Sequence, residues 1–319
     1  MKILVIGAGR WGSFIAWYLC KVGHDVSLYG REDSEKFKEI KEKRENGMIV
    51  LQDNLKLTSN LREALEADVI HVGVSAQKFR DVCKDLKDLG ISDKIICLNM
   101  KGIEISTGKR LTEVAEEILD PSNKLAVWLG PGHPQEFFKG NPNCMVIDSV
   151  DFEVKDKLIK EYTSKLIRFY YGEDVIGNEI GAAYKNVIGI VAGMLDGANL
   201  TSLKGALMSR GCREVSRLIE AFGGKAITAY GLSHLGDYEA TLFSKLSNNR
   251  NFGESYIRGE KFEKLAEGYY TCEAIEKIAV KMNLDLPVNH FLYEVLYKGS
   301  DPKKELDRLL NRSLKSEFY

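Results

Sequence analysis

A glycine-rich turn near the N-terminus constrains the fold of this chain more than any other feature. Residues 1–6 form an apolar run typical of a strand, and Gly7, Gly9 and Gly12 follow it with G-x-G-x-x-G spacing. Residues 13–19 then have the pattern of a helix. In such a unit the glycines permit a tight turn, close approach of a pyrophosphate and close packing of helix on strand, and the helix N-terminus attracts the anion. The turn therefore predicts a dinucleotide-binding site.

The first half of the chain alternates strand and helix patterns, which is typical of an α/β sheet. Further strands are expected at residues 25–29, 69–74, 94–98, 125–129, 144–147 and 167–171, and residues 48–51 and 55–58 predict a small hairpin. Helical segments between the strands imply parallel pairing with right-handed crossovers. We therefore expect a Rossmann-type, doubly wound parallel sheet.

After about Gly172 the strand patterns stop and long helical patterns dominate. This change predicts a dinucleotide-binding domain at residues 1–174 and an all-α substrate and catalytic domain at residues 175–319. Because ligands of open parallel sheets bind at the carboxyl ends of the strands, we expect the helical domain to form the other wall of an interdomain cleft.

Charge and cysteine usage exclude several classes of protein. The net charge of −1 disfavours a general nucleic-acid or anionic-membrane binder. No apolar stretch reaches the ~18 residues of a transmembrane helix, and the N-terminal run is too short for a signal peptide. The six cysteines are scattered, without C-x-x-C pairs or zinc-type spacing, which indicates a reducing cytosol and no metal site.

The residues after the second strand bear on the choice of nucleotide. NAD-selective sites usually place an acidic residue there for the ribose 2′-hydroxyl, whereas an arginine suits a 2′-phosphate. Here Gly30 and Arg31 follow the strand, which favours NADPH, but Glu32 comes next and leaves NADH open.

A helix rich in small residues is predicted at residues 178–193. Gly181, Lys185 and Gly189 are spaced i, i+4, i+8 and therefore share one face. Because each helical glycine costs about 1 kcal/mol relative to alanine, we expect close backbone contacts at these positions. A lysine in such a setting is either buried, with a lowered pKa that suits acid–base chemistry, or extended to water along its aliphatic stem.

Taken together, motifs along nearly the whole chain resemble the NAD(P)-dependent glycerol-3-phosphate dehydrogenase family. The motifs that carry this resemblance are the glycine turn at 7–12, Val74-Ser75 with Arg80, Lys101-Gly102-Ile103-Glu104, Gly130-Pro131, residues 179–186, Ser209-Arg210-Gly211, Gly231-Leu232-Ser233 with Leu235-Gly236-Asp237, Asn249-Arg250 with Phe252-Gly253, and Glu267-Gly268.

The resemblance implies roles for particular residues. Lys185 matches the catalytic proton donor, Lys101 a second lysine that binds substrate and cofactor, and Asp237 the aspartate that orders the two lysines. The other substrate-binding positions implied are Gly130, Gly132, Asn186, Thr241, Ser247, Asn248, Asn249 and Arg250. The cofactor-binding positions implied are Gly7, Gly9, Arg10, Trp11, Gly12, Arg31, Ser75, Lys101, Pro134, Leu265 and Glu267.

The implied activity is reduction of dihydroxyacetone phosphate to sn-glycerol 3-phosphate with NADPH or NADH, which supplies phospholipid backbone. A cationic lysine suits this reaction because hydride addition to a ketone leaves a developing alkoxide that needs charge stabilisation and a proton. The resemblance also implies a cytoplasmic homodimer.

Two positions depart from the family pattern. Asn248 stands where the family has an arginine for the substrate phosphate, and an amide cannot make the bidentate, charge-assisted contact of a guanidinium. His133 stands in the loop after Gly130-Pro131, where the family has other residues. Our hypothesis is that His133 and Arg250 replace the missing arginine, or that the substrate differs.

Two alternatives therefore stay open. One keeps the hydride chemistry and acts on another small phosphorylated or carboxylated ketone. The other is a non-catalytic, cofactor-binding redox sensor.

Overall fold

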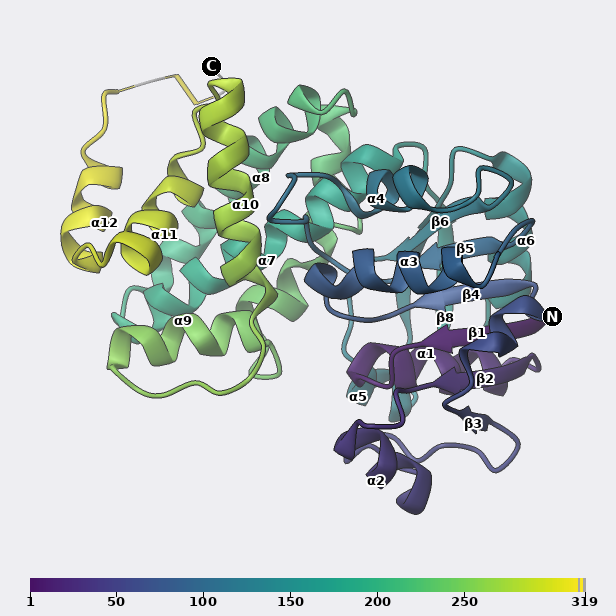
Figure 1. Ribbon diagram of the computed structural model, residues 1–319. Coiled ribbons are helices and arrows are strands. Elements are labelled where there is room, and N and C mark those ends of the chain that lie inside the picture. Colours follow the sequence, from purple (N-terminus) through teal and green to yellow (C-terminus); the bar gives the residue numbers. More distant parts are fainter. Residues whose placement is uncertain (315, 318–319) are drawn as a thin grey trace. The chain divides into compact units, whose positions relative to one another are not determined.

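The computed structural model describes residues 1–314, 316 and 317, and it divides into two compact units (Figure 1). The first unit comprises Met1–Met100 and Leu111–Val175, and the second comprises Lys101–Arg110 and the chain from Ile176 onward. Each unit has its own hydrophobic core. Within the described residues, the helices are too short or too polar to cross a bilayer.

The segment Lys101–Arg110 belongs to the helical unit, although the predicted division at residue 174 assigns it to the first domain. Its Ile103 side chain is 1% exposed and lies in the core of the second unit. Its last residue, Arg110, places Nη1 2.6 Å from Oε2 of Glu179. Burial of one apolar side chain and one ion pair thus attach this loop to the helical unit.

An eight-stranded sheet forms the centre of the first unit, in the order β3-β2-β1-β4-β5-β6-β7-β8. The strands are β1 Lys2–Ile6, β2 Asp25–Tyr29, β3 Lys56–Thr58, β4 Val69–Val72, β5 Ile95–Leu98, β6 Lys124–Leu129, β7 Asn143–Asp148 and β8 Ile167–Tyr171. β4 and β5 are buried along their whole length, as expected for parallel strands covered on both faces. The predicted doubly wound sheet is confirmed.

The strand order reverses beside β1. The chain first runs outward through β2 and β3 and then returns to β4 on the other side of β1. Gly7 follows β1 directly, and Gly73 follows β4. The glycine turn therefore lies at the topological switch point, where open α/β sheets bind their ligands.

Two predicted pairings are wrong. β6 and β7 are antiparallel, because the helix between them, α5 (Pro134–Phe138), is too short to carry the chain back across the sheet. The predicted hairpin at 48–58 also does not form: β3 pairs parallel with β2, while Ile49 and Leu51 are buried in the core.

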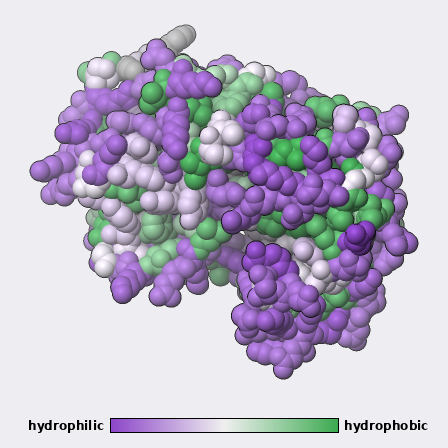
Figure 2. All heavy atoms as spheres, in the orientation of Figure 1, coloured by the Kyte–Doolittle hydropathy of each residue, from purple (hydrophilic) through white to green (hydrophobic). Residues whose placement is uncertain are grey.

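Helices cover both faces of the sheet. They are α1 Arg10–Lys21, α2 Glu35–Lys43, α3 Phe79–Asp88, α4 Leu111–Ile118, α5 and α6 Phe152–Tyr162. Buried side chains of α1, α5 and α6 share one core with alternate residues of the strands. α3 and α4 contact each other and lie outside that core. α2 is mostly polar, and its region is almost entirely hydrophilic in Figure 2.

The second unit is helical, and from Ile176 onward the described residues form no strand. Its helices are α7 Val175–Gly197, α8 Lys204–Ala221, α9 Asn248–Arg258, α10 Glu267–Met282, α11 Pro287–Lys298 and α12 Pro302–Leu310. α7 is buried from Gly177 to Leu195. A helix enclosed on all sides in this way can place a polar side chain in a low-dielectric setting.

Candidate active site

In the glycine turn of the first unit, two glycines have no room for a side chain, and the third has free space around its Cα. Gly7 has φ +110°, and a Cβ there would lie 2.8 Å from the backbone oxygen of Gly73. A Cβ on Gly12 would lie 1.7 Å from the oxygen of Gly7, whereas one on Gly9 would meet nothing within 4 Å. Only Gly9 therefore faces open space, which suits close approach of a ligand to the backbone.

The N-terminus of α1 is arranged for an anion. Gly9 occupies the N-cap position and has no side chain to bond the first helical N–H groups, and the first turn carries no acidic residue. The positive end of the helix dipole is thus available. Together with the open space at Gly9, these features fit the pyrophosphate of a dinucleotide.

Other predicted cofactor positions of the first unit lie in the turn itself or on separate segments of the sheet domain. The Gly7 N–H donates to the Tyr29 oxygen at 3.0 Å, so the end of β2, with Arg31 two residues later, lies beside the turn. The Arg31 side chain is 75% exposed, with Nε 3.3 Å from Oδ1 of Asp33. Ser75 precedes the turn that leads to α3, Pro134 begins α5, and Trp11 packs edge-on against Phe14.

Within the second unit, two lysines share one carboxylate. Oδ2 of Asp237 lies 2.7 Å from Nζ of Lys101 and 2.8 Å from Nζ of Lys185. Lys185 also donates to the hydroxyl of Thr241 at 2.7 Å. The structure thus brings together all three catalytic residues implied by the resemblance, and a predicted substrate-binding threonine with them.

Burial sets the chemistry of Lys185. Its side chain is 9% exposed and Asp237 is 1% exposed. Burial lowers the pKa of the Lys185 ammonium to about 8, although the Asp237 carboxylate opposes this shift. An ammonium of this kind can release its proton near neutral pH. The alternative that Lys185 extends to water is excluded by its burial.

Close helix contacts hold this arrangement, as the glycine spacing predicts. A Cβ on Gly181 would lie 3.0 Å from the Cβ of His234, and one on Gly189 would lie 2.7 Å from Cγ2 of Thr241. The glycines of α7 therefore let the segment that carries Asp237 and Thr241 approach the Lys185 helix directly.

His234 is a residue that the sequence reasoning missed. It is fully buried; Nδ1 lies 2.8 Å from the Gly181 oxygen, and Nε2 lies 2.7 Å from the Tyr238 hydroxyl. Burial lowers its pKa to about 4, so the ring is neutral at physiological pH. Because Asp237 lies three residues further along the same short turn, these bonds help to fix its carboxylate.

A chain of amides links three predicted site segments. The Asn249 side-chain amide donates to Oδ1 of Asn186 at 3.0 Å, and the Asn186 amide donates to the Lys101 oxygen at 3.1 Å. Oδ1 of Asn249 accepts the Gly268 N–H at 2.9 Å, at the start of α10. Asn186 and Asn249 therefore join the Lys101 loop to α9 and to Glu267, the first residue of α10.

The other predicted site residues at the start of α9 have hydrogen-bond or ion-pair partners outside the lysine cluster. The Ser247 hydroxyl caps the helix by accepting the Arg250 N–H at 3.3 Å, and the Asn248 amide donates to the Leu265 oxygen at 3.1 Å. The Arg250 guanidinium is bound by Asp196. The suggested replacement of a phosphate-binding arginine by Arg250 is therefore at odds with this geometry, because the guanidinium already has a buried carboxylate partner.

The loop with Gly130, Gly132 and His133 belongs to the first unit. Gly130 and Gly132 have φ +127° and +125°, values that favour glycine, and a Cβ on Gly132 would lie 2.4 Å from the Phe137 ring. His133 is half-buried at the N-cap of α5. Its role as an anion contact stays a prediction.

Comparisons with known proteins agree with this geometry. Residues 2–155 match the family model described as NAD-dependent glycerol-3-phosphate dehydrogenase N-terminus, and residues 174–307 match the corresponding C-terminus. A glycerol-3-phosphate dehydrogenase (NAD(P)+) from Exiguobacterium sp. is 35% identical, over 99% of this chain and 97% of its own. One from Clostridium botulinum is 34% identical, over 100% and 99%.

A solved structure of similar fold is the glycerol-3-phosphate dehydrogenase of Coxiella burnetii. Its TM-score is 0.92 at 28% identity, and the match covers 98% of this chain and 99% of that one. The matches to both family models, together with full-length relatives above 30% identity, establish the family. This chain belongs to the NAD-dependent glycerol-3-phosphate dehydrogenase family.

Proposed function

We propose that this protein reduces dihydroxyacetone phosphate to sn-glycerol 3-phosphate, with NADPH or NADH as the hydride donor. The observation that carries the proposal is the buried cluster in which Asp237 binds both Lys185 and Lys101. Family membership supplies the substrate, and the cluster supplies a group able to donate a proton to its carbonyl oxygen.

Three residues of the lysine cluster have distinct roles in the proposed reduction. Lys185 donates its proton to the carbonyl oxygen as negative charge develops there, and its ammonium stabilises that charge. Asp237 keeps the two ammonium groups in place and offsets their mutual repulsion. Thr241 accepts a hydrogen bond from Lys185 and so limits the directions in which the remaining N–H groups point.

The nicotinamide cofactor supplies the hydride when it is bound. In the first unit, Gly7, Gly9 and Gly12 would hold its pyrophosphate at the N-terminus of α1. Arg31 lies at the end of β2, where it suits a 2′-phosphate, and this supports NADPH as the preferred cofactor. We include Leu265 and Glu267 in the cofactor-binding set from family membership.

We also propose a cytoplasmic homodimer that supplies glycerol 3-phosphate for phospholipid synthesis. These features follow from family membership. Light scattering on the purified protein tests this oligomeric state. The proposal predicts a mass twice that of the chain at micromolar concentration, and the mass of a single chain would reject it.

A second candidate keeps the chemistry and changes the substrate to another small phosphorylated or carboxylated ketone. The arrangement at the start of α9 supports this candidate. The Asn248 amide donates a hydrogen bond to the Leu265 oxygen, and Arg250 forms an ion pair with Asp196. Asn248 has no guanidinium, and the guanidinium of Arg250 is already paired with a carboxylate, so neither residue supplies an uncommitted cation for a phosphate.

Oxidation of NADPH and NADH with a panel of small ketones separates the candidates. The proposal predicts the highest kcat/KM with dihydroxyacetone phosphate. Turnover of another ketone without turnover of dihydroxyacetone phosphate would support the second candidate. Cofactor binding without turnover of any ketone would support the redox sensor.

A further inference from the structure

Helices α7 and α9 touch backbone to backbone. A Cβ on Gly193 of α7 would lie 1.9 Å from the Arg250 oxygen, and a Cβ on Gly253 of α9 would lie 2.0 Å from the Ile190 oxygen. No other residue type fits at either point. The separation of the two helices is therefore fixed, but glycines alone do not define how α9 is rotated about this contact.

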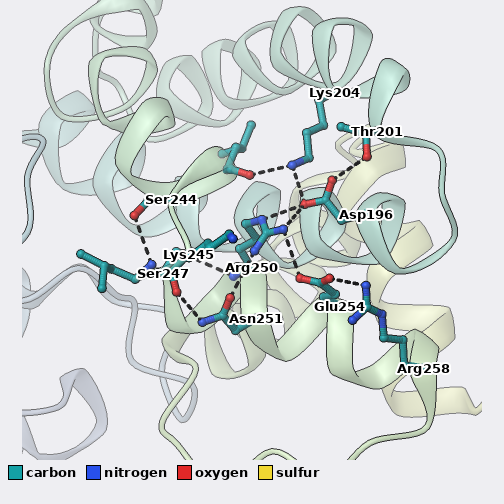
Figure 3. A network of polar contacts seen from close by, with 12 residues as sticks. Asp196, Thr201, Lys204, Ser244, Lys245, Ser247, Arg250, Asn251, Glu254 and Arg258 are labelled. Carbon is teal, nitrogen blue, oxygen red and sulfur yellow. Dashed lines mark hydrogen bonds and ion pairs between the residues drawn. The ribbon is translucent and has the colours of Figure 1, made fainter.

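A buried network of charged side chains fixes the rotation of α9 (Figure 3). Oδ2 of Asp196, near the end of α7, lies 2.7 Å from both Nε and Nη2 of Arg250 and 2.6 Å from Nζ of Lys204. Arg250 also places Nη2 3.1 Å from Oε2 of Glu254. The side chains of Asp196, Lys204 and Arg250 are 8%, 4% and 13% exposed. Charge-assisted bonds in such surroundings are strong and directional.

The same network is connected to two segments that contact the lysine cluster, the one that carries Thr241 and the one that carries Asn249. Lys204 donates to the Leu242 oxygen at 2.9 Å, and Leu242 follows Thr241, the hydrogen-bond partner of Lys185. Arg250 follows Asn249, whose amide binds Asn186. One carboxylate, that of Asp196, therefore connects the segment that orients Lys185 with the helix that orients Asn186.

We propose that Asp196 and Arg250 are positioning residues for the reduction. They hold Asn249 and Thr241 in register with Lys185, and Arg250 does not bind the substrate's phosphate. This inference rests on the proposed function, since its effect is read in the turnover of dihydroxyacetone phosphate. Displacement of reacting groups by about 1 Å costs on the order of 100-fold in rate, so a loosened α9 affects kcat.

The test compares kcat and KM of Arg250→Lys, Asp196→Asn and the double variant. Arg250→Lys keeps the charge but loses the two-point contact with Asp196. We expect each single variant to lower kcat about 10- to 100-fold, with KM for dihydroxyacetone phosphate changed less than about threefold. The double variant should be no slower than the slower single variant, because both remove the same interaction.

Arg258→Gln is the matched control. Arg258 lies on the same helix and pairs with Glu254 at 2.6 Å, but it is 48% exposed and belongs to the outer end of the network. Its kcat should equal that of the wild type. Thermal melting of every variant confirms that the protein compared is folded, and Arg250→Lys alone suffices should Asp196→Asn not fold.

Several outcomes would overturn the inference. A KM raised tenfold or more at unchanged kcat in Arg250→Lys would show that the guanidinium binds the phosphate. Multiplicative losses in the double variant, wild-type kinetics in both single variants, or an equal loss in Arg258→Gln would also contradict it. Lack of turnover by the wild type would instead reject the proposed function, and the variants would then be compared with whichever ketone the wild type reduces.

Discussion

Nζ of Lys185 lies 2.8 Å from Oδ2 of Asp237, and both side chains are buried. The carboxylate keeps an ammonium in a place where burial alone would favour the neutral amine. Removing Asp237 would leave two buried ammonium groups without their carboxylate, which costs several kcal/mol, whereas removing Lys185 leaves Asp237 paired with Lys101. The pair is therefore a poised proton donor that depends on its partner, and this relationship determines what the site can do.

The pH dependence of ketone reduction should report the Lys185 ammonium. Because burial lowers its pKa to about 8, the protonated donor is present below that pH and is lost above it. We expect kcat/KM for reduction to fall about tenfold per pH unit on the basic side, with an apparent pKa about 8. A steady-state pH profile measures this, and a profile that stays flat up to about pH 10 would argue against Lys185 as the acid.

Two glycines of the dinucleotide turn should respond differently to alanine. Gly12→Ala places a Cβ 1.7 Å from the Gly7 oxygen, so we expect a loss of about 1–3 kcal/mol or more in the free energy of unfolding. Gly9→Ala meets nothing within 4 Å and should leave that free energy unchanged, while cofactor affinity falls. Urea unfolding without cofactor and a cofactor titration measure the two effects. Equal destabilisation by both changes would contradict the assignment of Gly9 to the ligand side.

Glu214 should make the stability of the helical unit depend on pH. Its carboxyl group is buried, accepts the N–H groups of Val288 and Asn289 at 2.9 Å each, and accepts the hydroxyl of Tyr184. Burial raises its pKa to about 7, above the unfolded value. Between these two pKa values the folded state keeps a proton that the unfolded state has lost, so the free energy of unfolding falls as pH rises.

The comparison for this prediction is Glu214→Gln against the wild type. The variant loses this titration, so the stability advantage of the wild type should shrink from about pH 5 to about pH 7, by on the order of 1 kcal/mol per pH unit. Denaturant unfolding at a series of pH values measures it. A constant difference between the two proteins across this range would show that Glu214 does not titrate there.

Local patterns were sufficient to predict the dinucleotide turn and the small-residue helix that carries Lys185, but they left the burial of that lysine open. The glycine spacing follows one strand and precedes one helix, so its geometry depends on neighbours in the sequence. The i, i+4, i+8 spacing of Gly181, Lys185 and Gly189 likewise defines a helix face without tertiary information.

The remaining features depend on contacts between distant segments. β6 and β7 pair antiparallel because α5, which connects them, is short. The apolar periodicity of the sequence does not predict the length of this connection. The attachment of Lys101 to the helical unit depends on the burial of Ile103 among residues far along the chain. The pairing of Arg250 with Asp196, which lies on another helix, has no local signal in the sequence, so sequence patterns leave the guanidinium available for a substrate. For Asp237 the link to both lysines came from family resemblance, since aspartates after glycine are common caps and turns.

The most direct test of the account is the Lys185→Ala variant, measured for both turnover and cofactor affinity. Loss of the general acid should reduce kcat for dihydroxyacetone phosphate by about 10²–10⁴-fold. The dissociation constant for NADPH should stay within about threefold of the wild type, because the glycine turn lies in the other unit. A variant that retains wild-type kcat would contradict the assignment of Lys185 as the proton donor.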